Sequence, residues 1–579
     1  MSRVEERRTA AAVLVIGTGA AGLRAAIELA ETGVQVLCVG KRRRDDAHTV
    51  LASGGINAAL GTMDPEDSWQ QHAADTLRES YWLADPCTVE LLCREAPAAI
   101  EDLVRFGAQF AREDNGQLTQ RYFGAHRYRR TCFAGDYTGR EIQRTLVRRA
   151  VEAGVVIRDD VYVTRLLVHD GRVFGAYGFD VEDGSRWVIV ADALVLAAGG
   201  HTRIWRRSSS RRDENTGDAM RLAADAGCRL RDMELVQFHP TGMVFPEESA
   251  GTLVTEAVRG EGGILRNAAG ERFMERYDLE RLELSTRDRV ALANYTEIAE
   301  GRGTAHGGVL LDVSHVDRDL VLSRLPRMYR QLLDLAMLDI TTSPIEVAPT
   351  AHYSMGGVRV DPETHATDVE GLYAVGECAT GVHGANRLGG NSLAECVVFG
   401  RIVGAEAARW STQLDVQVRD RDAIAVARDE VDELLARRGA EFARPLQRAV
   451  RDLMSECAGV IRSETGLREG LAHLEEVVAR ARQLEVRPDI AGYDDLAHAF
   501  DLQGSLLAAR ATLDCALERR ETRGAHNRVD YPDQDPGLQV NLVWTRHGAV
   551  TREPLPQPSA EVAALAGGPE LGAAGRLLE

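Results

Sequence analysis

A glycine-rich loop near the start of the chain has the residue types and spacing of a dinucleotide phosphate site. Gly17-Thr18-Gly19-Ala20-Ala21-Gly22 stands between a short apolar run, 12–16, and a segment with helical spacing, 23–32. Glycines let the backbone approach a pyrophosphate, and the N-terminus of the following helix supplies a positive field. We therefore expect dinucleotide contacts at Gly17, Gly19, Ala20 and Gly22. The acidic residue of a standard NAD site is missing, because Gly40-Lys41 follows the second strand.

Several later strings combine His, Arg, Thr and Gly in segments that do not look like packed core. They are 47–57 (AHTVLASGGIN), 215–218 (NTGD), 237–242 (QFHPTG), 255–263 (TEAVRGEGG), 287–288 (RD), 352–357 (HYSMGG), 382–393 (VHGANRLGGNSL) and 523–532 (RGAHNRVDYP). Together they resemble the succinate dehydrogenase and fumarate reductase flavoprotein family. The similarity covers the chain from about residue 12 to about residue 545.

The resemblance implies a bound FAD that is attached covalently through His48. A histidyl substituent withdraws electrons from the flavin and makes it the stronger oxidant that an unactivated C–C bond requires. Lys41 is the only lysine of the chain, and we hypothesise that its compact ammonium contacts the ribose or phosphates of FAD. The further FAD contacts that the resemblance implies are Thr49, Gly54, Gly55, Asp218, Glu377, Asn391, Ser392 and Leu393.

Oxidation of succinate would explain the residue types of the remaining motifs. The reaction removes a hydride from one carbon and a proton from its neighbour, so both carboxylates must be held firmly. The planar fork of Arg387 suits one carboxylate. The resemblance implies that His239 and His352, with the hydroxyl of Thr255, hold and polarise the other.

The resemblance also implies a proton pathway. Arg287 is the expected proton shuttle, and Glu256 and Arg259, three residues apart, are its expected relay. Arginine is always protonated in water, which makes it a poor base and a good acid for fumarate reduction. In the oxidation direction the proton must therefore leave through the relay.

These residues require an α/β fold that is assembled from distant segments. We expect an FAD-binding Rossmann-like domain, an inserted α+β capping domain that closes over the substrate, and a C-terminal helical domain. Short alternating runs between about 155 and 199 predict an antiparallel meander, and the apolar strands 193–198 and 371–376 are expected to join the first domain. The expected boundaries are 1–234 and 349–420 for the FAD-binding domain, 235–348 for the capping domain, 421–540 for the helical domain and 541–579 for an irregular arm.

Composition narrows the functional classes. The formal net charge of −19 argues against a nucleic-acid partner. The sequence also contains no run of 18 consecutive apolar residues, the length needed to span a membrane. The nine cysteines contain no CxxC pair, so we expect no metal site on this chain. Electrons must then leave through other proteins, and the resemblance implies an iron–sulfur subunit with a quinone-reducing membrane anchor beyond it. The N-terminus lacks a signal peptide, so we expect a peripheral subunit on the cytoplasmic side of a prokaryotic membrane.

Three alternatives to succinate oxidation remain open. Fumarate reductase uses the same site in reverse, and L-aspartate oxidase shares the fold but generally lacks the tethering histidine. A non-catalytic flavin electron carrier would not need the joint presence of Arg287, His239, His352 and Arg387. Ser53 stands where the family usually has Gln or Glu beside the flavin. A short neutral residue leaves space for water and does not oppose an oxidising flavin, which favours succinate oxidation.

Overall fold

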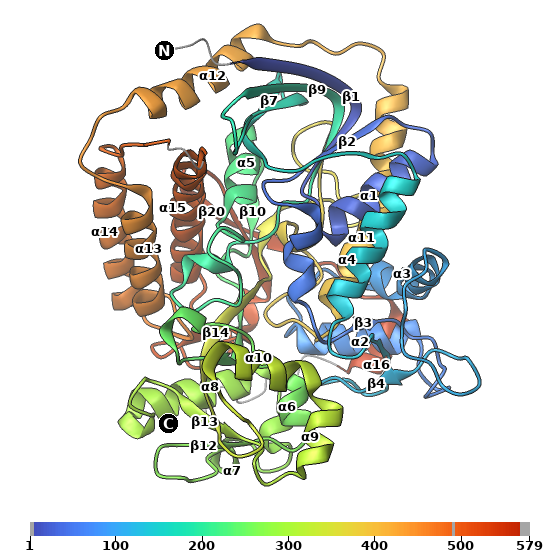
Figure 1. Cartoon of the computed structure of the whole chain (residues 1–579), viewed down its shortest axis with the longest axis vertical. Helices are drawn as coiled ribbons and strands as arrows, with labels where there is room; N and C mark the ends of the chain where they lie inside the picture. Colours follow the sequence, from blue (N-terminus) through green and yellow to red (C-terminus); the bar gives the residue numbers. More distant parts are fainter. Residues whose placement is uncertain (1–4, 489–491, 568–579) are drawn as a thin grey trace.

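The main sheet of the computed structural model, which describes residues 5–488 and 492–567, is assembled from strands far apart in the chain (Figure 1). Its strand order is β6-β2-β1-β9-β8-β7, and β16 pairs with β9. The strands are β1 (Glu6–Ile16), β2 (Val36–Val39), β6 (Val156–Arg158), β7 (Val161–His169), β8 (Arg172–Asp180), β9 (Arg186–Leu196) and β16 (Leu372–Ala374). Strands β6, β2, β1, β9 and β16 run parallel, as a dinucleotide-binding sheet requires.

The meander was predicted one strand too long. β7, β8 and β9 form the antiparallel part, whereas the run VVIRDD contributes β6, which pairs in parallel with β2. The alternation of apolar residues is the same for both pairings, so the local pattern could not separate them.

The strand β1 divides the hydrophobic core into two. Val13 and Val15 pack with α1 (Ala20–Glu31), α3 (Pro86–Arg105), α4 (Thr138–Glu152) and α11 (Asn391–Gln413). Leu14 and Ile16 belong to the cluster that contains α5 (Asp218–Ala226) and the C-terminal helices. Alternate residues of a strand face opposite sides, so one apolar run supports helices on both faces of the sheet.

A second unit with its own core lies at one end of the molecule (Figure 1). Its antiparallel sheet has the order β11-β14-β13-β12. The strands are β11 (Val236–Met243), β12 (Ile264–Arg266), β13 (Val309–Asp312) and β14 (Ile345–Ser354); the helices are α6 (Glu256–Gly260), α7 (Met274–Tyr277), α8 (Arg287–Glu297), α9 (Arg318–Arg324) and α10 (Pro326–Ala336). It corresponds to the expected α+β capping unit.

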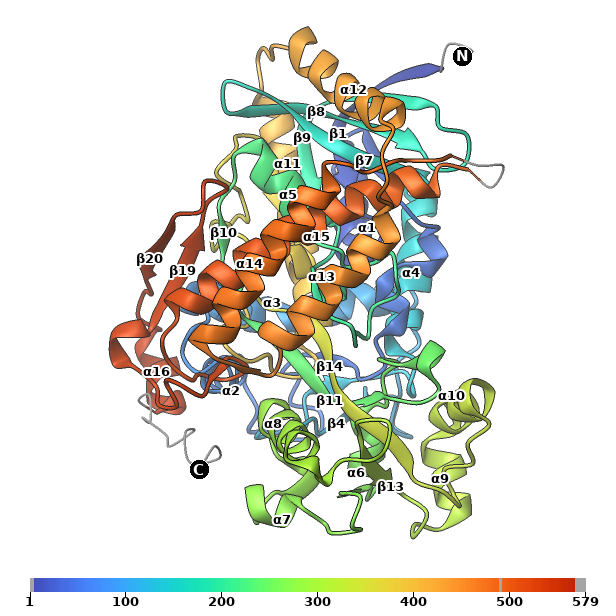
Figure 2. The same ribbon diagram turned by 90° about the vertical axis from the view of Figure 1, so that its left-hand side faces the viewer.

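The C-terminal helices lie side by side along the first unit (Figure 2). α13 (Ala443–Cys457), α14 (Glu464–Ala481) and α15 (Asp494–Glu518) pack against one another, and α15 also packs on α5. α12 (Arg421–Ala436) crosses to β7 instead. Within the described residues, no helix has the length and apolar character needed to cross a bilayer.

The segment expected to be an irregular arm contains regular structure up to residue 567. β19 (Val540–Trp544) and β20 (Val550–Pro554) form an antiparallel hairpin, and β10 (Leu230–Arg231) extends it. α16 (Ala560–Ala566) packs on α2 (Trp69–Glu79). β10 and α2 lie more than 300 residues upstream of the elements that they contact, so the Pro-, Gly- and Ala-rich local sequence gave no sign of these two contacts. Residues 568–579 lie outside the described part of the chain.

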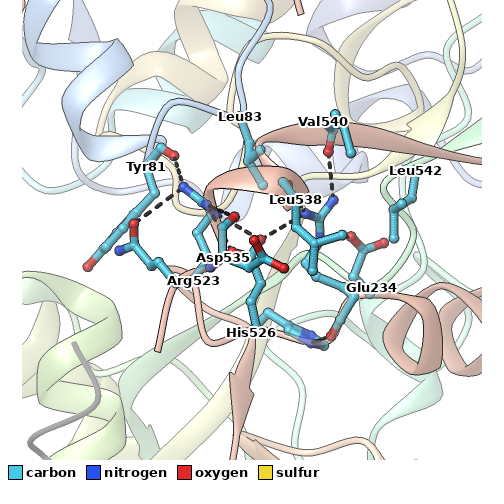
Figure 3. A network of polar contacts seen from close by, with 12 residues as sticks. Tyr81, Leu83, Glu234, Arg523, His526, Asp535, Leu538, Val540 and Leu542 are labelled. Atoms are coloured by element: carbon cyan, nitrogen blue, oxygen red, sulfur yellow. Dashed lines mark hydrogen bonds and ion pairs between the residues drawn. The ribbon is translucent and has the colours of Figure 1, made fainter. Parts of the chain in front are cut away.

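The string RGAHNR belongs to a buried ionic network rather than to the cofactor cleft (Figure 3). Arg519 Nε donates to Glu234 Oε1 at 2.6 Å, and Arg523 Nε donates to Glu521 Oε1 at 2.8 Å. Arg523 Nη1 also donates to the carbonyl of Tyr81 at 3.1 Å. The network therefore joins the segment after α2, the start of the capping unit and the C-terminal segment.

Candidate active site

One cavity collects nearly all of the predicted cofactor residues at the carboxyl ends of β1, β2, β9 and β16. The predicted residues that line it are Gly17, Gly19, Ala20, Lys41, His48, Thr49, Gly54, Gly55, Asp218, Glu377, Ser392 and Leu393. The helix α1 begins there with Gly19 as its N-cap, without a side-chain cap and without an acidic residue in its first turn. The first backbone N–H of α1, at Ala20, donates to Thr49 Oγ1 at 3.0 Å, and a helix N-terminus that faces the cleft suits the pyrophosphate of FAD.

Gly22 and Asn391 do not line this cavity. A Cβ at Gly22 would lie 2.0 Å from the carbonyl oxygen of Gly17, so this glycine permits close packing of helix against loop. Asn391 Oδ1 accepts a hydrogen bond from Asn57 at 2.7 Å and, at 2.8 Å, pairs with His72 Nε2. Both residues therefore shape the walls of the cleft from behind.

The ammonium of Lys41 is held by two carboxylates at the edge of the cavity. Its Nζ lies 3.0 Å from Asp218 Oδ2 and 3.1 Å from Asp501 Oδ1, and the hydroxyl of Tyr162 donates to the same Asp501 oxygen at 2.8 Å. Burial opposes the charge, but the two carboxylates outweigh it and raise the pKa of Lys41. Asp501 lies on α15, so this C-terminal helix contacts a residue that lines the cofactor cavity.

His48 lies in a single 3-10 turn, His48–Leu51, and its ring is fixed by a carboxylate. The Nδ1 atom lies 3.0 Å from Glu214 Oε2, and Arg211 Nη1 donates to the other oxygen of Glu214 at 3.0 Å. Burial would raise the pKa of Glu214, but His48 and Arg211 lower it to about 2. The same carboxylate overcomes the effect of burial on His48 and raises its pKa.

Arg387 is a buried cation without a carboxylate partner among the described residues. Its side chain donates to Ser392 Oγ at 3.0 Å and to Gln237 Oε1 at 3.0 Å, while its Nε has no partner. The guanidinium carbon lies 4.6 Å from the ring centre of Tyr353. Burial, followed by repulsion from Arg287, lowers the pKa of Arg387 to about 9. An unpaired buried charge is costly, and an anionic ligand would relieve that cost.

His239 and His352, on the neighbouring strands β11 and β14, lie side by side in the lining of the same cavity, with ring centres 5.3 Å apart in an edge-to-face arrangement. The backbone N–H of Thr241 donates to His239 Nδ1 at 3.2 Å, which leaves Nε2 as the protonated nitrogen of the neutral ring. His352 Nδ1 lies 2.8 Å from Ser209 Oγ. Burial and nearby arginines lower the pKa of both histidines well below the usual value, so both rings are neutral hydrogen-bonding groups near pH 7.

The predicted proton shuttle and its two relay residues lie next to one another in a row. Arg287 Nε donates to Glu256 Oε2 at 3.0 Å, and Arg259 Nη2 lies 3.8 Å from the same oxygen. Burial would raise the pKa of Glu256, but Arg287 and Arg259 lower it to about 2. Thr255 caps α6 without a side-chain bond, so its buried hydroxyl is left for another acceptor. Thr255, Glu256 and Arg287 line the cavity, whereas Arg259 lies behind Glu256.

The short side chain of Ser53 had suggested room for water beside it, but an arginine also contacts Ser53. Arg327 Nη1, from α10 of the capping unit, donates to Ser53 Oγ at 3.1 Å and to the carbonyl of Asp136 at 2.7 Å. Ser53 lines the cofactor cavity, so this contact brings a cation to the position where the family usually has Gln or Glu.

Three residues of the site had been assigned no role from sequence. Gln237 accepts from Arg387 and, at 3.4 Å, from Arg287, and it donates to the carbonyl of Arg387 at 3.0 Å. Its place beside His239 in QFHPTG was a usable signal. Glu214 directly precedes the string NTGD, but its partner His48 lies 166 positions away, and Arg327 stands in no motif.

The fold and the site define an FAD-dependent oxidoreductase. A family model described as an FAD binding domain matches residues 12–393, and one described as fumarate reductase flavoprotein C-term matches residues 447–562. The chain therefore belongs to the succinate dehydrogenase and fumarate reductase flavoprotein family, which confirms the resemblance and the expected fold class.

Curated relatives from both branches of the family match the chain along most of its length. It is 42% identical to a fumarate reductase (CoM/CoB) subunit of Methanothermobacter marburgensis, covering 92% of this chain and 97% of that one. It is 38% identical to the succinate dehydrogenase flavoprotein subunit of Rickettsia bellii, covering 92% of each. Similarity to named relatives therefore leaves the direction of the reaction open.

Solved structures from both the succinate dehydrogenase and the fumarate reductase branch also match the chain. A structure of Mycobacterium smegmatis Sdh1 in complex with UQ1 matches with a TM-score of 0.88 at 38% identity, covering 96% of each chain. A quinol-fumarate reductase with menaquinol molecules matches with a TM-score of 0.91 at 31% identity, covering 96% of this chain and 99% of that one.

Proposed function

We propose that this chain is the catalytic flavoprotein subunit of a succinate dehydrogenase, with FAD attached covalently through His48. The observation that carries the proposal is the buried Arg387, which lacks a carboxylate partner among the described residues and shares a cavity with His239, His352 and Thr255. A dicarboxylate would supply the missing charge at Arg387 and accept hydrogen bonds from the other three side chains.

FAD, when bound, accepts the hydride that leaves the substrate. Arg387 clamps one carboxylate, while neutral His239 and His352 donate hydrogen bonds to the other. Arg287 lies at the cavity wall beside them and takes the proton in step with its transfer onward to Glu256. Arg259 stabilises the Glu256 carboxylate from behind. The strongly lowered pKa values of both histidines make their rings weak bases, which favours Arg287 with Glu256 as the proton route.

The contact between Arg327 and Ser53 supports oxidation as the physiological direction. A guanidinium hydrogen-bonded to Ser53 places positive charge at the cofactor cavity, and positive charge favours a flavin that has gained electrons. The second candidate is fumarate reductase, favoured by the 42% identity to the methanogen protein.

The partners that we propose are an iron–sulfur protein and, beyond it, a membrane anchor. Support comes from the names of similar structures, one of which contains UQ1 and another menaquinol. The chain would then be a peripheral subunit on the cytoplasmic side of the membrane. Co-purification of the tagged chain with a cluster-containing protein tests this assembly.

Turnover with succinate, fumarate and L-aspartate, using artificial electron acceptors and donors, tests the function. We expect succinate oxidation and slower fumarate reduction, with no aspartate oxidation. Protein-film voltammetry of the assembled complex then compares the two directions near neutral pH. A larger catalytic current for fumarate than for succinate would establish the reductase instead.

A further inference from the structure

Glu214 is the only side chain that hydrogen-bonds to His48 among the described residues, and the mechanism above does not use it. The Oε2 atom of Glu214 lies 3.0 Å from His48 Nδ1, and the carboxylate is 5% exposed. Its oxygens also accept from the backbone and the guanidinium of Arg211, at 3.3 and 3.0 Å. The acid is therefore held in place from one side while it presents an oxygen to His48 on the other.

The hydrogen bond fixes which nitrogen of His48 is available. A carboxylate that pairs with Nδ1 keeps the proton on that atom, because an ionised carboxylate can only accept. Whenever the ring is neutral, the other nitrogen, Nε2, then carries the lone pair. His48 and Glu214 both line the cofactor cavity, and Nε2 has no protein partner in the described part of the chain.

We propose that Glu214 positions and activates His48 for its covalent attachment to FAD. This inference rests on the attachment proposed above and adds a positioning residue for that step. The carboxylate selects the tautomer with a free Nε2 and stabilises the positive charge that the imidazole acquires as its lone pair forms a bond.

The attachment balances as a two-electron oxidation. A C–H bond of the flavin ring methyl group breaks and its proton leaves, while the Nε2 lone pair forms the new C–N bond. One electron pair remains on the flavin ring. An external two-electron acceptor, such as dioxygen or fumarate, removes that pair together with two protons, one of which comes from the imidazolium. Glu214 faces the imidazolium throughout and is not consumed.

The alternative is that Glu214 only closes the ion-pair cluster of the 211–214 loop. Arg42 forms ion pairs with both Glu214 and the neighbouring Asp213, and it thereby links Asp213 to that cluster. Asp213 is 38% exposed and makes no contact with His48, so Asp213→Asn removes one charge from the same loop and provides a matched control. A role confined to the loop predicts similar effects of both substitutions on stability and none on attachment.

The test follows covalent flavin in the full-length chain after a short pulse of expression. Flavin fluorescence of the acid-denatured band, divided by total FAD bound, gives the attached fraction over time. We expect Glu214→Gln to slow attachment at least fivefold per FAD bound. Asp213→Asn should match the wild type, and Glu214→Asp should recover part of the rate because it restores the charge.

A smaller change than fivefold in Glu214→Gln overturns the inference. Complete loss of FAD from Glu214→Gln also counts against it, because the carboxylate would then act in binding. Succinate turnover, measured in parallel on the wild type, separates this outcome from failure of the proposed function. If the wild type turns over succinate and Glu214→Gln attaches flavin at the wild-type rate, only the role of Glu214 is rejected. If the wild type attaches flavin but does not turn over succinate, only the proposed reaction is rejected.

Discussion

Replacing Arg387 by methionine should stabilise the substrate-free protein while it abolishes the response to dicarboxylates. Arg387 is 3% exposed, and its pKa is lowered from the ordinary 12.5 to about 9, chiefly by burial and then by Arg287. That displacement corresponds to about 5 kcal/mol against the charged form, at about 1.4 kcal/mol for each tenfold. The penalty is complete below pH 9 and fades as the pH rises through that value, because the folded-state pKa lies below the unfolded one.

The gain from removing the charge is smaller than the penalty itself. Methionine would leave Ser392 and Gln237 without the hydrogen bonds that Arg387 donates to them, at a cost of about 1–3 kcal/mol. The net gain should be about 2–4 kcal/mol. It appears as a rise in melting temperature of about 2–4 °C for each kcal/mol in a domain of 150–250 residues.

Thermal melting of the holoprotein with and without malonate, at one scan rate, measures both effects. The wild type should gain stability with malonate, a dicarboxylate that cannot be dehydrogenated, and Arg387→Met should not. Arg130 is the matched control: it is fully buried, but lies 2.7 Å from both Asp67 and Asp75. Arg130→Met should lose several kcal/mol, because it leaves the buried Asp67 without a cation and removes one of the two arginines that pair with Asp75. Melting of Arg387→Met below the wild type without ligand would refute the reasoning.

Further substitutions test the other parts of the site. Arg287→Ala should lower succinate turnover by ~10²–10⁴-fold or more while FAD content stays near wild type, since it removes the proton shuttle; retention of a tenth of the rate would assign that role elsewhere. Arg327→Met should lower the flavin reduction potential, measured by spectroelectrochemistry, and an unchanged potential would show that this cation does not act on the flavin. His48→Ser should release all flavin into the acid supernatant and impair succinate oxidation more than fumarate reduction. Lys41→Met should reduce FAD content and melting temperature together, because it leaves Asp218 and Asp501 facing each other without a cation; normal FAD content would remove Lys41 from the cofactor site.

The sequence was sufficient for the parts of the site that lie within short motifs. His239, Thr255, Glu256, Arg287, His352 and Arg387 were all selected from such strings, and the structure brings them to one cavity. A motif fixes residue types at close spacing, and β11, α6, α8 and β14 then carry these types to a common place. The roles assigned to these side chains await the experiments above.

Contacts between distant segments could not be predicted in the same way. Lys41 and Asp501 are 460 residues apart, and Ser53 and Arg327 are 274 apart. Neither pair has a local pattern, because an acid on α15 or an arginine on α10 looks like any solvated helix residue. The parallel pairing of β6 with β2 and the pairing of β19 with β10 were missed for a related reason: each depends on a strand that only the folded chain supplies.

The interleaved sheet has a consequence for how the protein is made. β1 and the glycine loop are synthesised before the other strands of the sheet, but β1 stays without its neighbour β9 until residue 196 has been synthesised, and β9 waits for β16 until residue 374. At ~5–20 residues per second, the nascent chain carries an unfinished nucleotide cleft for tens of seconds. The Asp501 contact with Lys41 comes later still. The cleft is therefore complete only after most of the chain has been synthesised, so we expect FAD to bind late, and parallel strand edges stay exposed until then.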